Sequence, residues 1–213
     1  MLFQLVKKDF LLVRKYMLIM LLFCIIVPPF FMIRLPEYAG IMGFILITIY
    51  SVFMLLQYVS MKETQFSKAS ALLCALPYSR KDIVLSRYIF CLIIYFGCCL
   101  IFGIETLVFP QLGTFSVAKP VMLFLVISFV LSIYLPVHYK LGCEKTKIFF
   151  IIIIMASSFV FPQFYKIARG MDFSILNILN PTILLGSVII FSIIILTVSA
   201  SFSIQIYKKV DLL

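Results

Sequence analysis

The chain offers few side chains that could catalyse a reaction or hold a metal. His138 is the single histidine, which excludes motifs that bind zinc through paired histidines. Residues 142–146 end in Lys-Thr, but Glu144 stands where a phosphate-binding loop needs glycine, and Tyr139 replaces its first glycine. The remaining residues do not supply a nucleophile paired with a base. We therefore expect no enzymatic activity, no metal site and no cofactor in this chain, and no ATP bound by the chain alone.

One carboxylate lies inside a strongly apolar run. Glu105 is flanked by Ile104, Thr106 and Leu107, and Pro110 follows shortly after. An ionisable group inside a membrane span is costly unless it faces protein or a water-filled cavity. Glu105 is thus either a contact on a substrate or ion pathway, or a carboxylate near enough to the outer surface to be hydrated.

The six cysteines do not predict a disulfide framework. None of them falls in a loop that we expect outside the cell, where disulfides form and persist. We interpret Cys98 and Cys99 as packing residues of a span. The cysteines are Cys24, Cys74, Cys91, Cys98, Cys99 and Cys143.

The composition predicts an all-α polytopic membrane protein. Hydrophobic residues make up 64% of the 213 residues and charged residues only 12%, which no water-soluble domain could accommodate. The apolar runs predict six transmembrane helices in a single domain, residues 1–213, that contains no ATPase domain. The expected spans are 16–33, 38–59, 88–109, 120–138, 148–164 and 182–207, with a compact basic loop at 139–147 and a polar connection at 165–181 that could include a short helix at 173–179.

The net charge of +10 predicts orientation rather than nucleic-acid binding, because the basic residues flank the apolar runs. Most Lys and Arg residues lie on the side that holds both termini and the segment between spans 2 and 3. The positive-inside rule therefore predicts cytoplasmic termini and a cytoplasmic central segment.

The N-terminal stretch 1–15 has the pattern of an amphipathic helix lying in the membrane interface before the first span. Its apolar face would contain Phe3, Val6, Phe10 and Val13. The basic residues that we expect to anchor it at the headgroups are Lys7, Lys8, Arg14 and Lys15.

The central segment, residues 60–87, is the one long polar insertion in the chain. It has apolar residues at helical spacing, namely Phe66, Ala69, Leu72, Leu73 and Leu76. Pro77 should end that helix, and Ser79 with Asp82 has the spacing of a capping box that starts the next one. Such a helix would lie on the lipid surface or bind a soluble partner.

The central segment resembles that of the ABC-2 type permease family. The resemblance rests on Lys62-Glu63, on Ala71-Leu72-Leu73, and on the stretch from Leu76-Pro77 through Ser79-Arg80 and Ile83-Val84 to Arg87-Tyr88. Arg87 stands where lysine is commoner in the family and keeps the charge. The basic N-terminus, six spans and the chain length also fit, so the resemblance covers essentially the whole chain.

The resemblance implies a permease subunit of an ATP-binding cassette exporter in a bacterial cytoplasmic membrane. Residues 62–76 would be a cytoplasmic coupling helix that docks on a separate ATPase, which binds ATP and magnesium and is present in two copies. A second permease subunit, identical or not, would complete the pathway for a hydrophobic or amphipathic substrate such as a toxic peptide or drug, in contact with membrane lipids. The residues implied to face the ATPase or to set the helix angle are Lys62, Glu63, Phe66, Leu72, Leu73, Pro77, Arg80 and Lys81.

A second class of function remains open from the residues. The chain could be an ATP-independent membrane protein, such as a secondary carrier, a channel or an immunity protein that sequesters a toxin. This reading predicts a lipid-lying central segment and no dependence on an ATPase. Ion-coupled carriers usually have several charged residues within their spans, whereas Glu105 is the single candidate in this chain.

Overall fold

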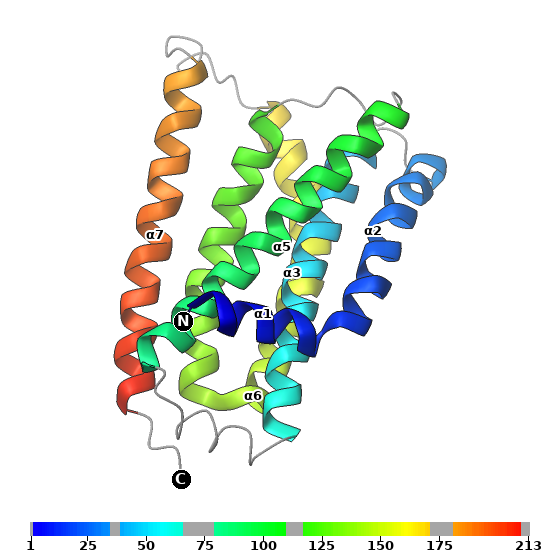
Figure 1. Ribbon diagram of the computed structural model, residues 1–213. Coiled ribbons are helices and arrows are strands. Elements are labelled where there is room, and N and C mark those ends of the chain that lie inside the picture. The colour runs from blue at the N-terminus through cyan, green and yellow to red at the C-terminus, as the bar shows by residue number, and fades with distance from the viewer. Residues whose placement is uncertain (1, 35–38, 66–78, 110–116, 171–180, 210–213) are drawn as a thin grey trace.

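The computed structural model describes residues 2–34, 39–65, 79–109, 117–170 and 181–209, and within them it leaves out most side chains from 143 to 170. Over these residues the protein is built from helices, with one short helix lying across the lower part of a bundle of long ones (Figure 1). The helices are α1 (Leu2–Leu12), α2 (Arg14–Arg34), α3 (Ala39–Gln65), α5 (Arg80–Val108), α6 (Ala118–Gly170) and α7 (Pro181–Lys209).

The helix lengths and compositions confirm a polytopic all-α membrane protein. Five helical stretches are long and apolar enough to cross a bilayer: Arg14–Ile33, Gly43–Glu63, Arg80–Val108, Ala118–Gly142 and Thr182–Lys208. The sixth expected span, 148–164, lies in the helical second part of α6, where most side chains are not described, and it stays a prediction.

α3 is the central helix of the bundle. Two thirds of the residues in its most apolar stretch are buried (67%), whereas the figure for α2 and α7 is 17%. The side chains around α3 form one continuous apolar core, with Phe53 and Leu56 of α3, Phe90 of α5 and Leu135 of α6 among its fully buried members. α2 and α7 carry large exposed side chains such as Leu18 and Ile190, which suit a lipid environment.

α1 is helical as expected, and one of its faces packs against the bundle. Leu5, Val6 and Asp9 are buried against α5 and α3, while Phe3 is 90% exposed. The ring of Phe10 is half-buried and makes an edge contact with Phe90 at 4.9 Å between centroids. Of the residues expected on the apolar face, Val6 and Val13 are buried in the protein and Phe10 is half-buried, whereas Phe3 takes no part in this packing.

Where we expected a basic loop, 139–147, the structure has a helix with a break at one residue. Helical backbone continues past Tyr139, and two helices meet at Gly142, which has φ 79° and ψ 174°. Side chains with a Cβ essentially never adopt this backbone conformation, so glycine is required there. A single residue thus connects the two parts of α6.

The start of α5 confirms the predicted cap. The Ser79 hydroxyl accepts a hydrogen bond from the backbone N–H of Asp82 at 3.1 Å, and Ser79 itself has extended backbone angles. α3 continues to Gln65 and α5 begins at Arg80, so both helices extend beyond the expected ends of their apolar runs, Val59 and Tyr88. Residues 66–78 and 173–179, where we expected short helices, lie outside the described residues.

Hydrogen bonds between helices join α5, α6 and α7. The Tyr88 hydroxyl lies 2.7 Å from the Ser199 hydroxyl and 2.9 Å from that of Ser203. Ser199 in turn donates to the backbone carbonyl of Ser132 at 3.0 Å. Polar groups inside a span must find partners within the protein, and this chain of bonds provides them.

Candidate functional site

Four charged side chains from three helices meet at the lower end of the bundle. We call Lys8, Asp9, Glu63 and Arg87 the charge cluster. Lys8 donates a hydrogen bond of 2.8 Å to Glu63 Oε1, and Arg87 Nη2 forms an ion pair with Glu63 Oε2. Asp9 completes the cluster through Lys8 Nζ at 3.4 Å and Arg87 Nε at 3.8 Å. Two positive and two negative groups balance one another.

Burial differs strongly within the charge cluster. The side chains of Asp9 and Arg87 are 1% and 6% exposed, whereas those of Glu63 and Lys8 are 26% and 31% exposed. Neither oxygen of Asp9 has a hydrogen-bond partner among the described residues. Burial raises the pKa of Asp9, and the nearby charges of Arg87 and Lys8 only partly oppose this shift. Asp9 is therefore the costly member, and Arg87 is the buried cation that makes it tolerable.

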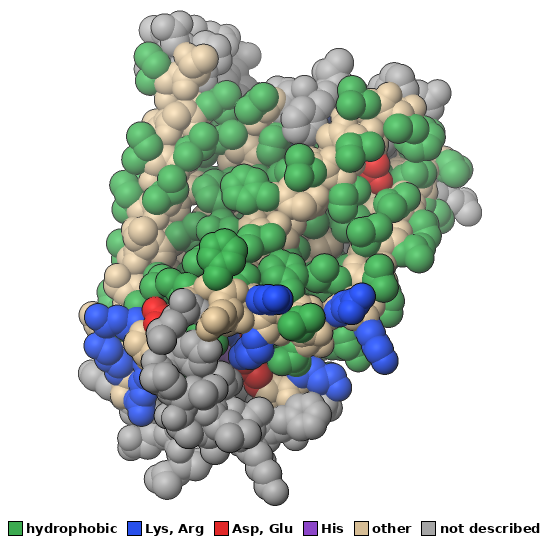
Figure 2. All heavy atoms as spheres, viewed as in Figure 1, with side chains coloured by type: hydrophobic (Ala, Val, Ile, Leu, Met, Phe, Trp, Pro, Cys, Tyr) green, Lys and Arg blue, Asp and Glu red, His purple; other side chains and the backbone are tan. Residues whose placement is uncertain are grey.

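The charge cluster lies close to the end of α3 and the start of α5, the two helices that flank residues 66–78. Glu63 is in the last turn of α3, before residues 66–78, and Arg87 lies two turns into α5, after them. The chain thus fastens α1 to both flanks of the segment that resembles a coupling helix. Figure 2 shows Lys and Arg side chains gathered at this end of the molecule.

The residues expected to face the ATPase or to set the angle of the coupling helix fall into three groups in the structure. Glu63 belongs to the charge cluster, and Arg80 donates a hydrogen bond of 2.9 Å to the carbonyl of Lys208 at the end of α7. Lys62 is half-buried and Lys81 is exposed. Phe66, Leu72, Leu73 and Pro77 lie outside the described residues, and the role of the whole set stays a prediction.

The four basic residues expected to anchor the N-terminal helix at the headgroups differ in their surroundings. Lys7, Arg14 and Lys15 are exposed around α1 and the start of α2, a placement suited to lipid headgroups. Lys8 instead turns toward Glu63 and Asp9. The structure therefore joins one expected anchor to one expected coupling residue.

Glu105 lies far along α5 from the charge cluster, in the turn before the helix ends at Val108. It is 7% exposed, and both carboxylate oxygens are buried with no hydrogen-bond partner among the described residues. Phe102, one turn earlier, stacks on Phe44 of α3 at 4.5 Å between ring centroids. Glu105 thus points into protein rather than into open solvent.

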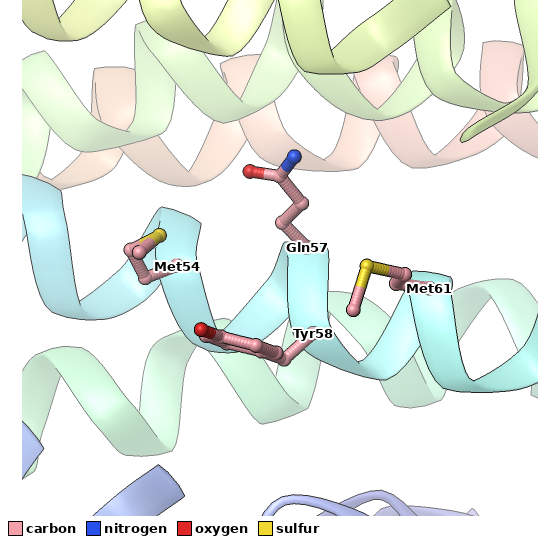
Figure 3. Close-up of a pocket in the computed structure, with 4 residues that line it drawn as sticks. All are labelled: Met54, Gln57, Tyr58 and Met61. Carbon is pink, nitrogen blue, oxygen red and sulfur yellow. The ribbon is translucent and has the colours of Figure 1, made fainter. Parts of the chain in front are cut away.

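A pocket of about 280 Å³ lies against one face of α3. We call it the α3 pocket; among the described residues, Met54, Gln57, Tyr58 and Met61 line it. In Figure 3 the Gln57 amide and the Tyr58 ring project to different sides of α3, and Met54 and Met61 lie toward either end. The pocket therefore combines soft apolar walls with an amide and a phenol inside a span.

Sequence reasoning missed Asp9, the cluster role of Arg87 and the α3 pocket. The signal for the pocket was present, because residues 54, 57, 58 and 61 have the spacing of one helical face and Gln57 is an amide inside an apolar run. Asp9 and Arg87 are far apart in sequence, and no local pattern pairs them. Among the described residues, no group of His, Cys, Asp and Glu side chains could hold a metal ion.

Comparison with known proteins identifies one relationship over almost the whole chain. The family described as ABC-2 family transporter protein matches residues 4–208. No curated protein and no solved structure matches the chain. The match extends from within α1 to the end of α7 and so includes the charge cluster, the α3 pocket and Glu105.

Proposed function

This chain belongs to the ABC-2 family of transporter proteins, and from that membership we propose that it is the permease subunit of an ATP-binding cassette exporter. It would move a hydrophobic or amphipathic substrate, such as a toxic peptide or a drug, out of a bacterial cell. A separate ATPase, acting as two copies with ATP and magnesium, supplies the energy. A second permease subunit forms the other wall of the pathway.

The charge cluster is the observation that carries this proposal. A permease driven by a separate ATPase needs a rigid connection from the docking segment to its spans. Glu63 and Arg87 stand on the two helices that flank residues 66–78, and they pair directly with each other. A push on residues 66–78 would therefore move the inner ends of α3 and α5 together, and α1 with them through Lys8 and Asp9.

The coupling helix, residues 62–76, docks on the ATPase in this proposal. Phe66, Leu72 and Leu73 supply its apolar face, Lys62 lies at its charged edge, and Lys81 faces the ATPase from the start of α5. Pro77 sets the angle between this helix and α5. Arg80 holds the start of α5 against the end of α7, which its hydrogen bond to the Lys208 carbonyl supports.

Glu105 lies on the substrate pathway in this proposal. Glu105 is 7% exposed and its carboxylate has no hydrogen-bond partner among the described residues, so its burial destabilises the folded protein. A substrate or water that contacts the carboxylate during transport would offset this cost. Changing Glu105→Gln keeps the shape and removes the charge. Unchanged transport by that variant at every pH would remove Glu105 from the pathway.

The first test is co-purification of an ATPase with the tagged protein in mild detergent. The neighbouring genes are co-expressed, and the wild type is compared with Leu73→Asp and with a control, Leu141→Asp. Leu141 is 49% exposed at the same end of the bundle and lies outside the proposed docking helix. A charge in an apolar contact should reduce the ATPase activity recovered with Leu73→Asp at least about tenfold, while Leu141→Asp should match the wild type.

Two results would contradict the proposal in different ways. Equal recovery with Leu73→Asp and the wild type would move the docking surface away from residues 62–76. If the wild type recovers no ATPase, the energy source is missing and an ATP-independent carrier, channel or sequestering protein replaces the exporter.

A further inference from the structure

We propose that the α3 pocket is the subsite that recognises an uncharged amphipathic group of the transported molecule, one that carries an amide or hydroxyl beside an apolar chain. The inference rests on the proposed function, because it assigns a substrate class to a transporter whose substrate is otherwise open. Four side chains of α3 carry it: Met54, Gln57, Tyr58 and Met61.

Gln57 is the polar centre of the subsite. Its side chain is half-buried inside the span Gly43–Glu63 and makes no hydrogen bond to any described residue. An amide in an apolar environment is destabilising unless its donors and acceptor are satisfied. A ligand group that both donates and accepts, such as another amide or a hydroxyl, is the natural partner.

The walls of the pocket suit an apolar chain of variable shape. Met54 and Met61 are flexible and polarisable, and such side chains adapt to different ligands. Tyr58 is held more firmly, because its ring stacks on Tyr16 of α2 with 3.9 Å between centroids. The pocket therefore has one fixed wall with a phenol, two adaptable ends and the Gln57 amide.

The described lining of the α3 pocket suits an uncharged ligand group. No charged side chain is among the described residues that line it. The nearest charged residues along α3, Lys62 and Glu63, lie beyond its inner end, where Glu63 is already paired with Lys8 and Arg87. A volume of about 280 Å³ accommodates part of a ligand rather than a whole drug-sized molecule.

The pocket and the charge cluster share one rigid element. Met61 and Glu63 both lie in the last turns of α3, so a movement transmitted through Glu63 would also move the inner wall of the pocket. Ligand release would then follow from the same helix movement that the ATPase drives.

Photolabelling with a neutral benzophenone carboxamide, para-benzoyl-N-butylbenzamide, tests the inference directly. The full chain is reconstituted in nanodiscs without nucleotide or ATPase, irradiated with the probe and digested, and the adducts are located by mass spectrometry. We expect the adducts to concentrate on residues 54–61. Gln57→Leu should reduce labelling there about fivefold, the effect of losing one hydrogen bond in an apolar site.

The control variant is Gln205→Leu, which removes an exposed amide from α7. It should leave the labelling of residues 54–61 unchanged. Adducts spread evenly over lipid-facing α2 and α7, absence of adducts, or labelling of 54–61 that is insensitive to Gln57→Leu would each overturn the inference. No ATPase takes part in the photolabelling, so the two tests can fail separately. If the ATPase co-purifies but residues 54–61 are not labelled as expected, the subsite is rejected and the exporter stands. If residues 54–61 are labelled as expected but no ATPase co-purifies, the exporter is rejected and the binding site stands.

Discussion

Replacing Arg87 by methionine should destabilise the protein more than any other single neutralisation within the charge cluster. Methionine is similar in length and carries no charge, so the change leaves Asp9 and Glu63 with Lys8 as their only cation in the cluster. Asp9 is 1% exposed and cannot recover hydration. Removing one partner of a buried ion pair costs about 3–5 kcal/mol of unfolding free energy. Lys8→Met should cost at most about 1 kcal/mol, because Lys8 is 31% exposed and water can replace it.

The assay is thermal unfolding in detergent, followed by circular dichroism. At about 2–4 °C per kcal/mol for a chain of this size, Arg87→Met should lower the melting temperature by roughly 6–20 °C, and Lys8→Met by no more than about 4 °C. A triple variant, Arg87→Met with Asp9→Asn and Glu63→Gln, removes the stranded charges and should regain most of the loss. Equal shifts for Arg87→Met and Lys8→Met, or no recovery in the triple variant, would refute the argument that buried charge balance stabilises this end of the bundle.

Two further predictions follow from single residues. Asp9 has a pKa raised by burial above its ordinary value of 3.8, so the folded state holds its proton more tightly than the unfolded state; stability should fall as the pH rises from that value through the folded-state pKa. Asp9→Asn should flatten this part of the curve of melting temperature against pH, and an unchanged curve would assign the dependence to other groups. Gly142→Ala should cost about 1–3 kcal/mol because of the positive φ at the break in α6. Its control, Gly186→Ala within α7, meets open space and should be neutral or slightly stabilising, and similar melting temperatures for both alanine variants would contradict the strained geometry.

Local sequence signals predicted the parts of the fold that depend on neighbouring residues. Ser79 caps α5 as its spacing with Asp82 indicates, because a cap is a contact between residues three positions apart. The apolar runs likewise predicted long membrane-crossing helices, because span length follows from bilayer thickness.

Contacts between distant residues could not be predicted in this way. Hydropathy ended the apolar run of α3 near Val59, yet the helix continues to Gln65, and its Glu63 pairs with Arg87 of α5 and Lys8 of α1. Asp9 belongs to the same set of pairs and is buried, which no local pattern in the sequence indicated. The break at Gly142 differs from its prediction in another way. The basic composition of residues 139–147 indicated a loop, but a single glycine with positive φ makes the turn there.

The charge cluster also imposes an order on biosynthesis. Lys8 and Asp9 leave the ribosome first, but Arg87, which pairs with Asp9, is made only after α2, α3 and residues 66–78. Until then the nascent α1 has to keep its carboxylate hydrated at the membrane surface. The first helix to be synthesised therefore reaches its final position only when α5 has begun to insert, and a chain arrested before Arg87 would display α1 undocked to the quality-control machinery of the cell.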